Sequence, residues 1–378
     1  MRRLALFAFL VAGATPLFAA ELQVGPGQTY ADPAAALKAA KAGDVIVVHA
    51  RPGGYGKVAL NVTKPKITIR AADESKRVHL DGDGYDYSGR GPVPRAIVQF
   101  SPGADGGVIE GFELTGAHNE SGNGAGVRIN QANDVAVRNC DIHDCDMGIM
   151  SNGNGTDATA KNQRIEACVI HANGTKVNAG YNHNLYLGGT SATLLRCEIY
   201  GSLTGHNLKS RAHLIEVREC FIHDSANREI DLVDDKGDTD RPGSDALIVD
   251  SRIVKSPTCA GNRGVIHFGK DGKSTRDGTL TIRDCEIVTP FVTPVITLDT
   301  PQTMAVLEHD TIWEGGHRQS NQVLLAATEA DLPHRLTGSD NWLGGGFAHS
   351  PLGGLTHTYI ANAGEKPATQ PSRTIGGR

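Results

Sequence analysis

The chain has few aromatic side chains, no excess of charge of one sign and an odd number of cysteines. Its 378 residues include 37 Lys and Arg against 42 Asp and Glu, a near balance that argues against a nucleic-acid binder, which needs a basic surface. Seven cysteines cannot all pair, so a complete disulfide framework is excluded. Aromatic residues make up only 5% whereas 46 Gly are present, which is typical of many short strands joined by tight turns.

Long hydrophobic runs are also missing. The apolar run at residues 4–11 falls short of the roughly 20 residues that a membrane span requires, and no later segment is long enough. Arg2 and Arg3 precede this run, and residues 17–20 form a plausible cleavage region, so we expect residues 1–20 to be a secretory signal peptide. The mature protein is then expected to be a monomer in the periplasm or outside a bacterial cell.

A six-residue phrase recurs along the chain at intervals of 23–34 residues. Its copies begin at Ile109, Val137, Ile165, Leu194, Val217, Ile248, Ile282 and Leu307. Each copy has an apolar first residue and Ile or Leu at its sixth position. The fourth and sixth positions share the parity of a strand, whereas the step from first to fourth breaks it, which predicts an intervening turn.

A second short strand follows most copies, with apolar and polar residues alternating. Examples are residues 127–129, 185–187, 208–210, 230–232, 266–268 and 296–298. Short strands in every repeat, with no helical pattern between them, predict an all-β fold: a single-stranded right-handed parallel β-helix, a solenoid of about ten coils. A leucine-rich repeat would need a different phrase, and propeller blades need about 40 residues.

The repeat makes most of the chain one domain. We expect the β-helix to occupy residues 21–340, with a capping helix over residues 34–41 that Asp32 and Pro33 introduce. Residues 341–378 are rich in Gly, Pro, Thr and Ser, and we expect a C-terminal extension that is partly disordered.

The fourth phrase position is predicted to form an internal stack of small apolar groups. Five cysteines occupy it: Cys140, Cys168, Cys197, Cys220 and Cys285. Cys145 and Cys259 fall outside this stack and could be exposed.

Aligning the second strands by their inward residues also aligns their outward neighbours. The inward residues are Leu185, Leu208, Ile230 and Ile266. One expected outward column is Asn184, Asn207 and Glu229, the next is Tyr186, Lys209, Asp231 and His267, and Arg211 lies beyond, with His183, His206 and Arg228 at the strand entrances. The plainer interpretation is a solvated face with a structural Lys209–Asp231 ion pair. So many polar groups on one face nevertheless indicate a functional site.

The coil pattern resembles the pectin-lyase-like superfamily of right-handed β-helix proteins over nearly the whole mature chain, and residues 182–188, 205–211 and 228–232 resemble a bacterial group of exported β-helix proteins. Within the superfamily, the layout of Asn207, Glu229, Asp231 and Lys236 is similar to that of the alginate and chondroitin lyase family. The resemblance implies Ca²⁺ bound by Asn207, Glu229 and Asp231, and a lysine base. An ion-pair network with Lys209 and Arg228 is the alternative for these three residues. The chain departs from the family on the following coil, where it offers His267 and Lys270 instead of an arginine.

The predicted activity is that of a polysaccharide lyase acting on an acidic, uronate-containing polysaccharide by β-elimination. A cation must neutralise the uronate carboxylate while a base removes the adjacent proton. Arg211, Arg228 or Ca²⁺ could supply the charge, and the candidate bases are Lys209, Lys236 and His206. Tyr186 or a histidine could protonate the leaving oxygen, and substrate contacts are expected from His183, Asn184, Asn207, Arg228 and His267.

Two other functions remain open at this point. A glycoside hydrolase on the same scaffold could use Glu229, Asp231 and Asp234 as its acid and base. A non-catalytic glycan-binding or surface-structural β-helix would bind without releasing product.

Overall fold

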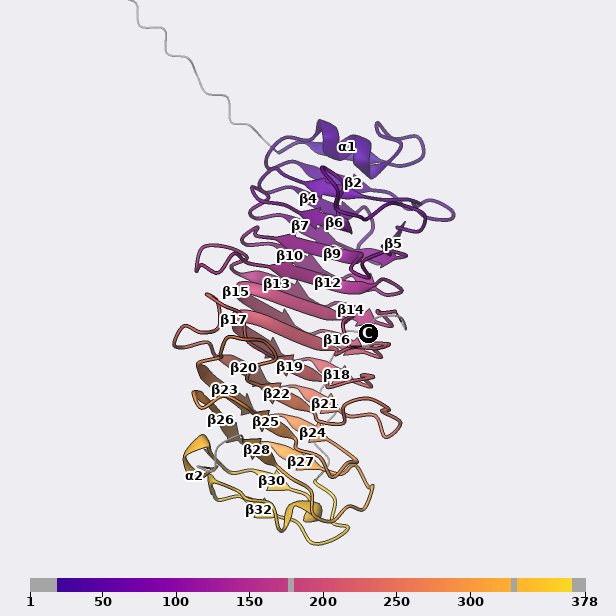
Figure 1. Ribbon diagram of the computed structural model, residues 1–378. Helices are drawn as coiled ribbons and strands as arrows, with labels where there is room; N and C mark the ends of the chain where they lie inside the picture. The colour runs from indigo at the N-terminus through magenta and orange to yellow at the C-terminus, as the bar shows by residue number, and fades with distance from the viewer. Residues whose placement is uncertain (1–18, 176–179, 328–331, 369–378) are drawn as a thin grey trace, which may run out of the picture.

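The chain winds into a tall stack of parallel strands, seen from the side in Figure 1. The computed structural model describes residues 19–175, 180–327 and 332–368. Its strands form a 21-stranded and an 11-stranded sheet, and neighbouring strands pair in parallel. Each central coil contributes strands to three faces, which we call stacks A, B and C.

The 21-stranded sheet contains stacks A and B. Stack A comprises β1 (Glu21–Val24), β2 (Val45–Val48), β4 (Thr68–Ala71), β7 (Val108–Glu110), β10 (Ala136–Arg138), β13 (Gln163–Glu166), β20 (Ala246–Val249), β23 (Gly278–Arg283), β26 (Thr303–Glu308), β29 (Leu336–Ser339) and β31 (Gly354–Thr356). Stack B comprises β3 (Leu60–Val62), β6 (Ala96–Phe100), β9 (Ala125–Asn130), β12 (Met147–Asn152), β19 (Ile230–Leu232), β22 (Ile266–Phe268), β25 (Ile296–Leu298) and β28 (Leu325–Ala327). The long strands β15 (Leu185–Leu195) and β17 (Leu208–Arg218) begin in stack B and end in stack A, which joins the two stacks into one sheet.

The 11-stranded sheet is stack C. It comprises β5 (Val78–Asp81), β8 (Phe112–Thr115), β11 (Asp141–Ile142), β14 (Val169–His171), β16 (Glu198–Tyr200), β18 (Phe221–His223), β21 (Arg252–Val254), β24 (Glu286–Val288), β27 (Thr311–Trp313), β30 (Trp342–Leu343) and β32 (Tyr359–Ile360). The chain passes from stack A to stack C to stack B in each central coil.

The repeated phrase forms the corner between stacks A and C. Its first residues pair in register along stack A and its sixth residues along stack C, as Val137 with Ile165 and Ile142 with Ile170 illustrate. The third residue of each copy has a positive φ between 45° and 85°: Gly111, Asn139, Ala167, Arg196, Glu219, Asp250, Asp284 and His309. This left-handed residue makes the predicted turn, so the break in strand parity is confirmed.

The core is a column of apolar side chains enclosed by the three stacks. The five cysteines of the fourth phrase position are buried and unpaired, as predicted. Cys145 and Cys259 are buried as well, with 0% and 5% of their surfaces exposed, so the idea that they could be exposed is wrong. Cys145 lies in the turn after β11, where its amide donates to the buried Asn173 side chain, and Cys259 packs against the carbonyl of Ala226.

A short helix covers the N-terminal end of the stack, as predicted. Helix α1 (Pro33–Ala39) has Pro33 in its first turn, and the carboxylate of Asp32 caps it by accepting from the amide of Ala35 at 2.8 Å. Ala36 is buried against the first strands, and Figure 1 shows α1 across the end of the coil.

The strand ladder continues past residue 340, where the domain boundary was expected. Strands β30 and β32 extend stack C and β31 extends stack A. Helix α2 (Leu332–Arg335) precedes β29, and a 3₁₀ turn (Gly345–Phe347) lies between β30 and β31 in sequence. The predicted boundary is therefore too early, because the copy of the phrase that runs from Gly338 to Leu343 begins with glycine instead of an apolar residue. Residues 369–378 of the expected extension, and residues 1–18 of the expected signal peptide, lie outside the described residues. No helix in the described ranges is long and apolar enough to cross a membrane.

Candidate active site

The outward column predicted for the second strands lies on stack B. The inward residues Leu185, Leu208, Ile230 and Ile266 are register partners. Their neighbours Tyr186, Lys209, Asp231 and His267 are therefore also register partners, on the four consecutive strands β15, β17, β19 and β22. Arg211 lies two residues further along β17, as the alignment also predicted, and its register partner is Gly188.

Asp231 is the centre of this cluster, although only 1% of its surface is exposed. One carboxylate oxygen lies 2.8 Å from Nδ1 of His267 and 3.0 Å from the guanidinium of Arg228. The other lies 3.1 Å from Nζ of Lys209 and 3.3 Å from Nε2 of His206. Burial by itself would raise the pKa of Asp231, but the hydrogen bond from His267 and the surrounding positive charges hold it well below its usual range. Asp231 is thus a buried anion that fixes four side chains.

Lys209 and Arg211 share a second carboxylate, which comes from a loop. Asp271 lies in the segment after β22 and accepts from Nζ of Lys209 and, at 2.6 Å, from Nη2 of Arg211. Nε of Arg211 donates to the phenol oxygen of Tyr186 at 2.8 Å. Lys209 is 8% exposed, whereas the Arg211 side chain is 22% exposed, so Arg211 can meet a ligand from solvent more readily.

Two histidines at the strand entrances lie against each other. The rings of His183 and His206 stack with centroids 5.0 Å apart, and Nδ1 of His183 accepts from the backbone amide of His206. Burial lowers the pKa of His206 to about 4 despite the nearby Asp231, and burial together with His206 lowers the pKa of His183 well below its usual value. Both rings are therefore neutral near pH 7.

His267 has the opposite protonation behaviour. It lies between Asp231 and Asp299, with Nδ1 and Nε2 each 2.8 Å from a carboxylate oxygen. Burial would lower the pKa of His267, but the hydrogen bonds to these two carboxylates raise it. His267 therefore adds positive charge to the cluster more readily than His183 or His206 does.

Three residues expected to face outward lie inside the β-helix. Asn184, Asn207 and Glu229 are each 0% exposed. They form a ladder in which Nδ2 of Asn184 donates to Asn207 at 2.8 Å and Nδ2 of Asn207 donates to Glu229 at 2.7 Å. They immediately precede β15, β17 and β19, where the chain is still in a turn and strand alternation does not apply. Asn184 and Asn207 were expected to contact substrate, but their buried side chains cannot reach a ligand on the outer face.

The residues predicted to bind Ca²⁺ are not brought together as a set of free oxygens. Lys255, itself buried, lies 3.2 Å from one oxygen of Glu229, and the other oxygen accepts from Asn207. Asp231 belongs to the outward column and has its own cationic partners. These three residues therefore do not fit a calcium site, since lysine and arginine side chains already pair with the carboxylates. Burial raises the pKa of Glu229 to about 7 against the opposing effect of Lys255.

Two further residues predicted to act in the site, Lys236 and Asp234, lie outside the cluster around Asp231. Lys236 is exposed in the loop after β19, and no hydrogen bond or ion pair links its side chain to the cluster within the described ranges. Asp234 accepts from the backbone amides of Asp271, Gly272 and Ser274, each at 2.8 Å, and so holds the loop that carries Asp271. Glu229, Asp231 and Asp234 thus all have structural partners, which argues against the acid–base set expected for a hydrolase.

Neither a protein-family model nor a curated protein matches the chain. Solved structures do match. A tailspike protein of E. coli bacteriophage HK620 is 11% identical, with a TM-score of 0.50, and the match covers 85% of this chain and 59% of the tailspike chain. The fold of this chain is a right-handed parallel β-helix. An alginate lyase from Paenibacillus sp. is 19% identical over 86% of this β-helix chain and 95% of its own, with a TM-score of 0.45. Pectate lyase Pel9A is 12% identical over 92% and 78%, with a TM-score of 0.43.

The most informative residue that the sequence did not reveal is Asp271. It lies 62 residues from Lys209 and 60 from Arg211, in a loop of the β-helix that has no strand periodicity. The one indication in the sequence is that Asp271 follows β22, the strand whose outward residue His267 belongs to the predicted column. A loop directly after a site strand could therefore have been searched for charged residues.

Proposed function

We propose that this protein cleaves an acidic polysaccharide by β-elimination on the outer face of stack B. The observation that supports this most directly is the position of Arg211, which is partly exposed and donates to the phenol oxygen of Tyr186. A cation and a proton-transfer group in contact are what elimination next to a carboxylate requires.

In this proposal Arg211 and Arg228 bind the uronate carboxylate. Their side chains are 22% and 24% exposed, and each is fixed by an acidic partner, Asp271 or Asp231. The two positive charges would stabilise the negative charge that develops on the carboxylate when the adjacent proton leaves.

Tyr186 and Lys209 are the groups we assign to proton transfer. Tyr186, reacting as a phenolate, would take the proton next to the carboxylate and become a neutral phenol, and the electron pair left on carbon would form the carbon–carbon double bond as the glycosidic oxygen departs. Lys209, an ammonium between two carboxylates, would give the departing oxygen its proton. This assignment reverses the expected roles, in which Lys209, Lys236 or His206 was the base and Tyr186 the acid. His206 is buried, Lys236 lies outside the cluster, and the two carboxylates beside Lys209 favour its ammonium form.

The experiment is a substrate panel with two readouts. Alginate, pectate, glycosaminoglycans and bacterial exopolysaccharides would be incubated with the protein while ultraviolet absorbance and new reducing ends are recorded. Elimination predicts that both rise together, because the new double bond is conjugated to the carboxylate. Reducing ends without absorbance would indicate hydrolysis, and retention on a glycan without either signal would indicate a binding protein. Either outcome would overturn the proposal.

We also propose that the protein is exported as a monomer. The basic residues Arg2 and Arg3 and the apolar run after them support export. N-terminal sequencing of the mature protein from cell fractions would test cleavage near residue 20, and light scattering during gel filtration would test the monomer.

A further inference from the structure

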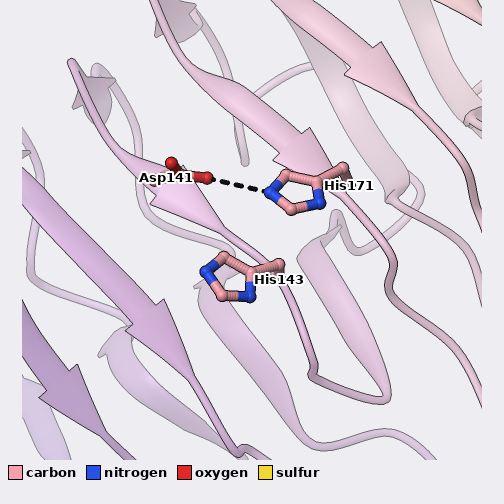
Figure 2. Close-up of side chains that lie close together, drawn as sticks. All are labelled: Asp141, His143 and His171. Atoms are coloured by element: carbon pink, nitrogen blue, oxygen red, sulfur yellow. Dashed lines mark ion pairs between the residues drawn. The ribbon is translucent and has the colours of Figure 1, made fainter.

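A group of three side chains on the outer face of stack C has the composition of a metal site. Asp141, His143 and His171 each offer one ligand atom, and the three atoms lie within 4.8 Å of one another. They come from the neighbouring coils of β11 and β14, and Figure 2 shows both imidazoles beside Asp141. This face is separate from the outer face of stack B.

One carboxylate oxygen of Asp141 is held by an arginine and the other faces the imidazole of His171. Arg77 donates to Oδ2 at 2.8 Å. The other oxygen, Oδ1, is buried and forms no hydrogen bond within the described part of the chain, although Nε2 of His171 lies 3.2 Å from it. A buried acceptor without a hydrogen bond is unfavourable unless a positive charge lies against it.

His143 has the arrangement of a metal ligand supported from behind. Its Nδ1 lies 2.8 Å from the carboxylate of Asp144, which can only accept, so Nδ1 carries a proton and Nε2 is the nitrogen that would bind a metal. That Nε2 is 3.3 Å from the carboxylate of Glu113. A lone pair and a carboxylate oxygen at this distance require a proton or a metal cation nearby.

The two rings are held by a stack that extends along the sheet. The centroids of His143 and His171 are 4.7 Å apart, and Tyr200 and then His223 continue the stack at 4.7 Å and 4.9 Å. A surface hollow of about 490 Å³, lined in part by Arg77, Glu113 and Asp141, borders the group and leaves room for water ligands.

We propose that Asp141, His143 and His171 bind a divalent transition-metal ion of the zinc type, with Glu113 as the fourth ligand. Imidazole nitrogen and carboxylate oxygen are the usual ligands of this ion class. Zinc ligands at about 2.0–2.2 Å from the metal stand roughly 3.4 Å apart, so small side-chain rotations would complete the site. The ion would join consecutive coils on stack C.

The chain contains a matched control in His223. Its Nδ1 lies 2.7 Å from Asp224 and its Nε2 lies 3.4 Å from Glu198, which reproduces the surroundings of His143. The strand position that corresponds to Asp141 is Phe221, and its stacking neighbour is Tyr200 instead of a second histidine. His223 therefore tests whether a histidine between two carboxylates is enough by itself to bind the metal ion.

The experiment is calorimetric titration of the EDTA-treated, dialysed full chain with Zn²⁺. We expect one ion per chain for the wild type and His223→Gln, and at least tenfold weaker binding for His171→Gln and Asp141→Asn. Thermal unfolding with and without Zn²⁺ gives a second readout, in which the midpoint should rise for the wild type and not for His171→Gln. Circular dichroism would verify that each variant folds. No Zn²⁺ binding by the wild type, or equal losses in His171→Gln and His223→Gln, would overturn the proposal.

Discussion

The ammonium nitrogen of Lys209 lies 3.1 Å from Oδ2 of Asp231, its register partner on the next strand, although both side chains are almost fully buried. The alternation of β17 and β19 brings the pair together, and Asp271 adds a second carboxylate from a loop. Lys209 is therefore oriented at the floor of the proposed site.

Replacing Lys209 with methionine keeps much of its length and removes the ammonium group. We expect elimination activity to fall by about 10²–10⁴, the usual contribution of a positioned acid or base. The initial rate of ultraviolet absorbance increase on the best substrate is the measurement. Lys161→Met, which removes an exposed charge in a loop, is the control and should keep wild-type activity. Full activity in Lys209→Met would refute the proposed role.

Replacing Tyr186 with phenylalanine removes one oxygen from the contact with Arg211. We expect kcat to fall by about 10²–10⁴ with little change in KM, because the phenol is assigned to proton transfer and not to substrate binding. Steady-state kinetics on a defined oligosaccharide would separate the two constants. A rise in KM at constant kcat would instead make Tyr186 a binding residue.

Chelation tests the calcium ion implied by the lyase resemblance. We expect EDTA to leave elimination activity unchanged, because Asn207 and Glu229 are buried and already bonded to each other and to Lys255. The proposed zinc-type ion on stack C is also remote from the reaction. Activity that disappears in EDTA and returns with Ca²⁺ would contradict the structure-based assignment.

The buried pair of Glu229 and Lys255 makes a prediction about stability. Lys255→Met leaves Glu229 without its cation, and breaking a buried pair in this way costs about 3–5 kcal/mol. Because Glu229 can take a proton, the loss should be large above pH 7 and small near pH 5. Urea unfolding at several pH values would measure it. The double variant Glu229→Gln with Lys255→Met should recover part of the loss, and equal losses at both pH values would exclude this explanation.

The buried carboxyl group of Asp310 leads us to predict a second pH dependence of the free energy of unfolding. Burial raises its pKa from 3.8 to about 8 although two backbone amides donate to it. A group whose pKa is raised in the folded state stabilises the fold at pH values below its unfolded-state pKa. That contribution is lost as the pH rises through its folded-state pKa. The free energy of unfolding should therefore fall by up to about 1.4 kcal/mol per pH unit between these values.

The matched variant for this effect is Asp310→Asn. The following coil has Asn341 at the corresponding position, where its side chain accepts from the amide of Asp310 and donates to the carbonyl of Leu307. An asparagine at position 310 can accept from the amide of Cys285 in the same way without ionising, and loses only the longer bond from the amide of Glu308. We expect the variant to be more stable than the wild type above pH 8, and a wild-type pH profile that Asp310→Asn leaves unaltered would disprove the assignment.

The sequence predicted the coil register because apolar side chains repeat at the same place in every coil. Leu185, Leu208 and Ile230 could be aligned from that pattern, and the alignment correctly placed Lys209 beside Asp231. Strand alternation fails one residue before each strand, so Asn207 and Glu229 were assigned to the wrong side. Their polar groups can be buried because the ladder and nearby backbone carbonyls satisfy them.

Loop residues could not be predicted in the same way. Asp271 reaches Lys209 and Arg211 through a fold of the chain that has no repeat. The amides of that loop are anchored by Asp234, a contact between segments nearly forty residues apart, and one sequence offers no spacing rule for it.

The left-handed residue at the corner between stacks A and C has a consequence for how this molecule can change. That corner has the same length in every copy of the phrase, so the varying repeat lengths arise at the connections on either side of stack B. Insertions there would leave the registered strands in place. The walls around the proposed glycan site can therefore be reshaped during evolution, or by engineering, while the hydrophobic interior of the β-helix is inherited unchanged.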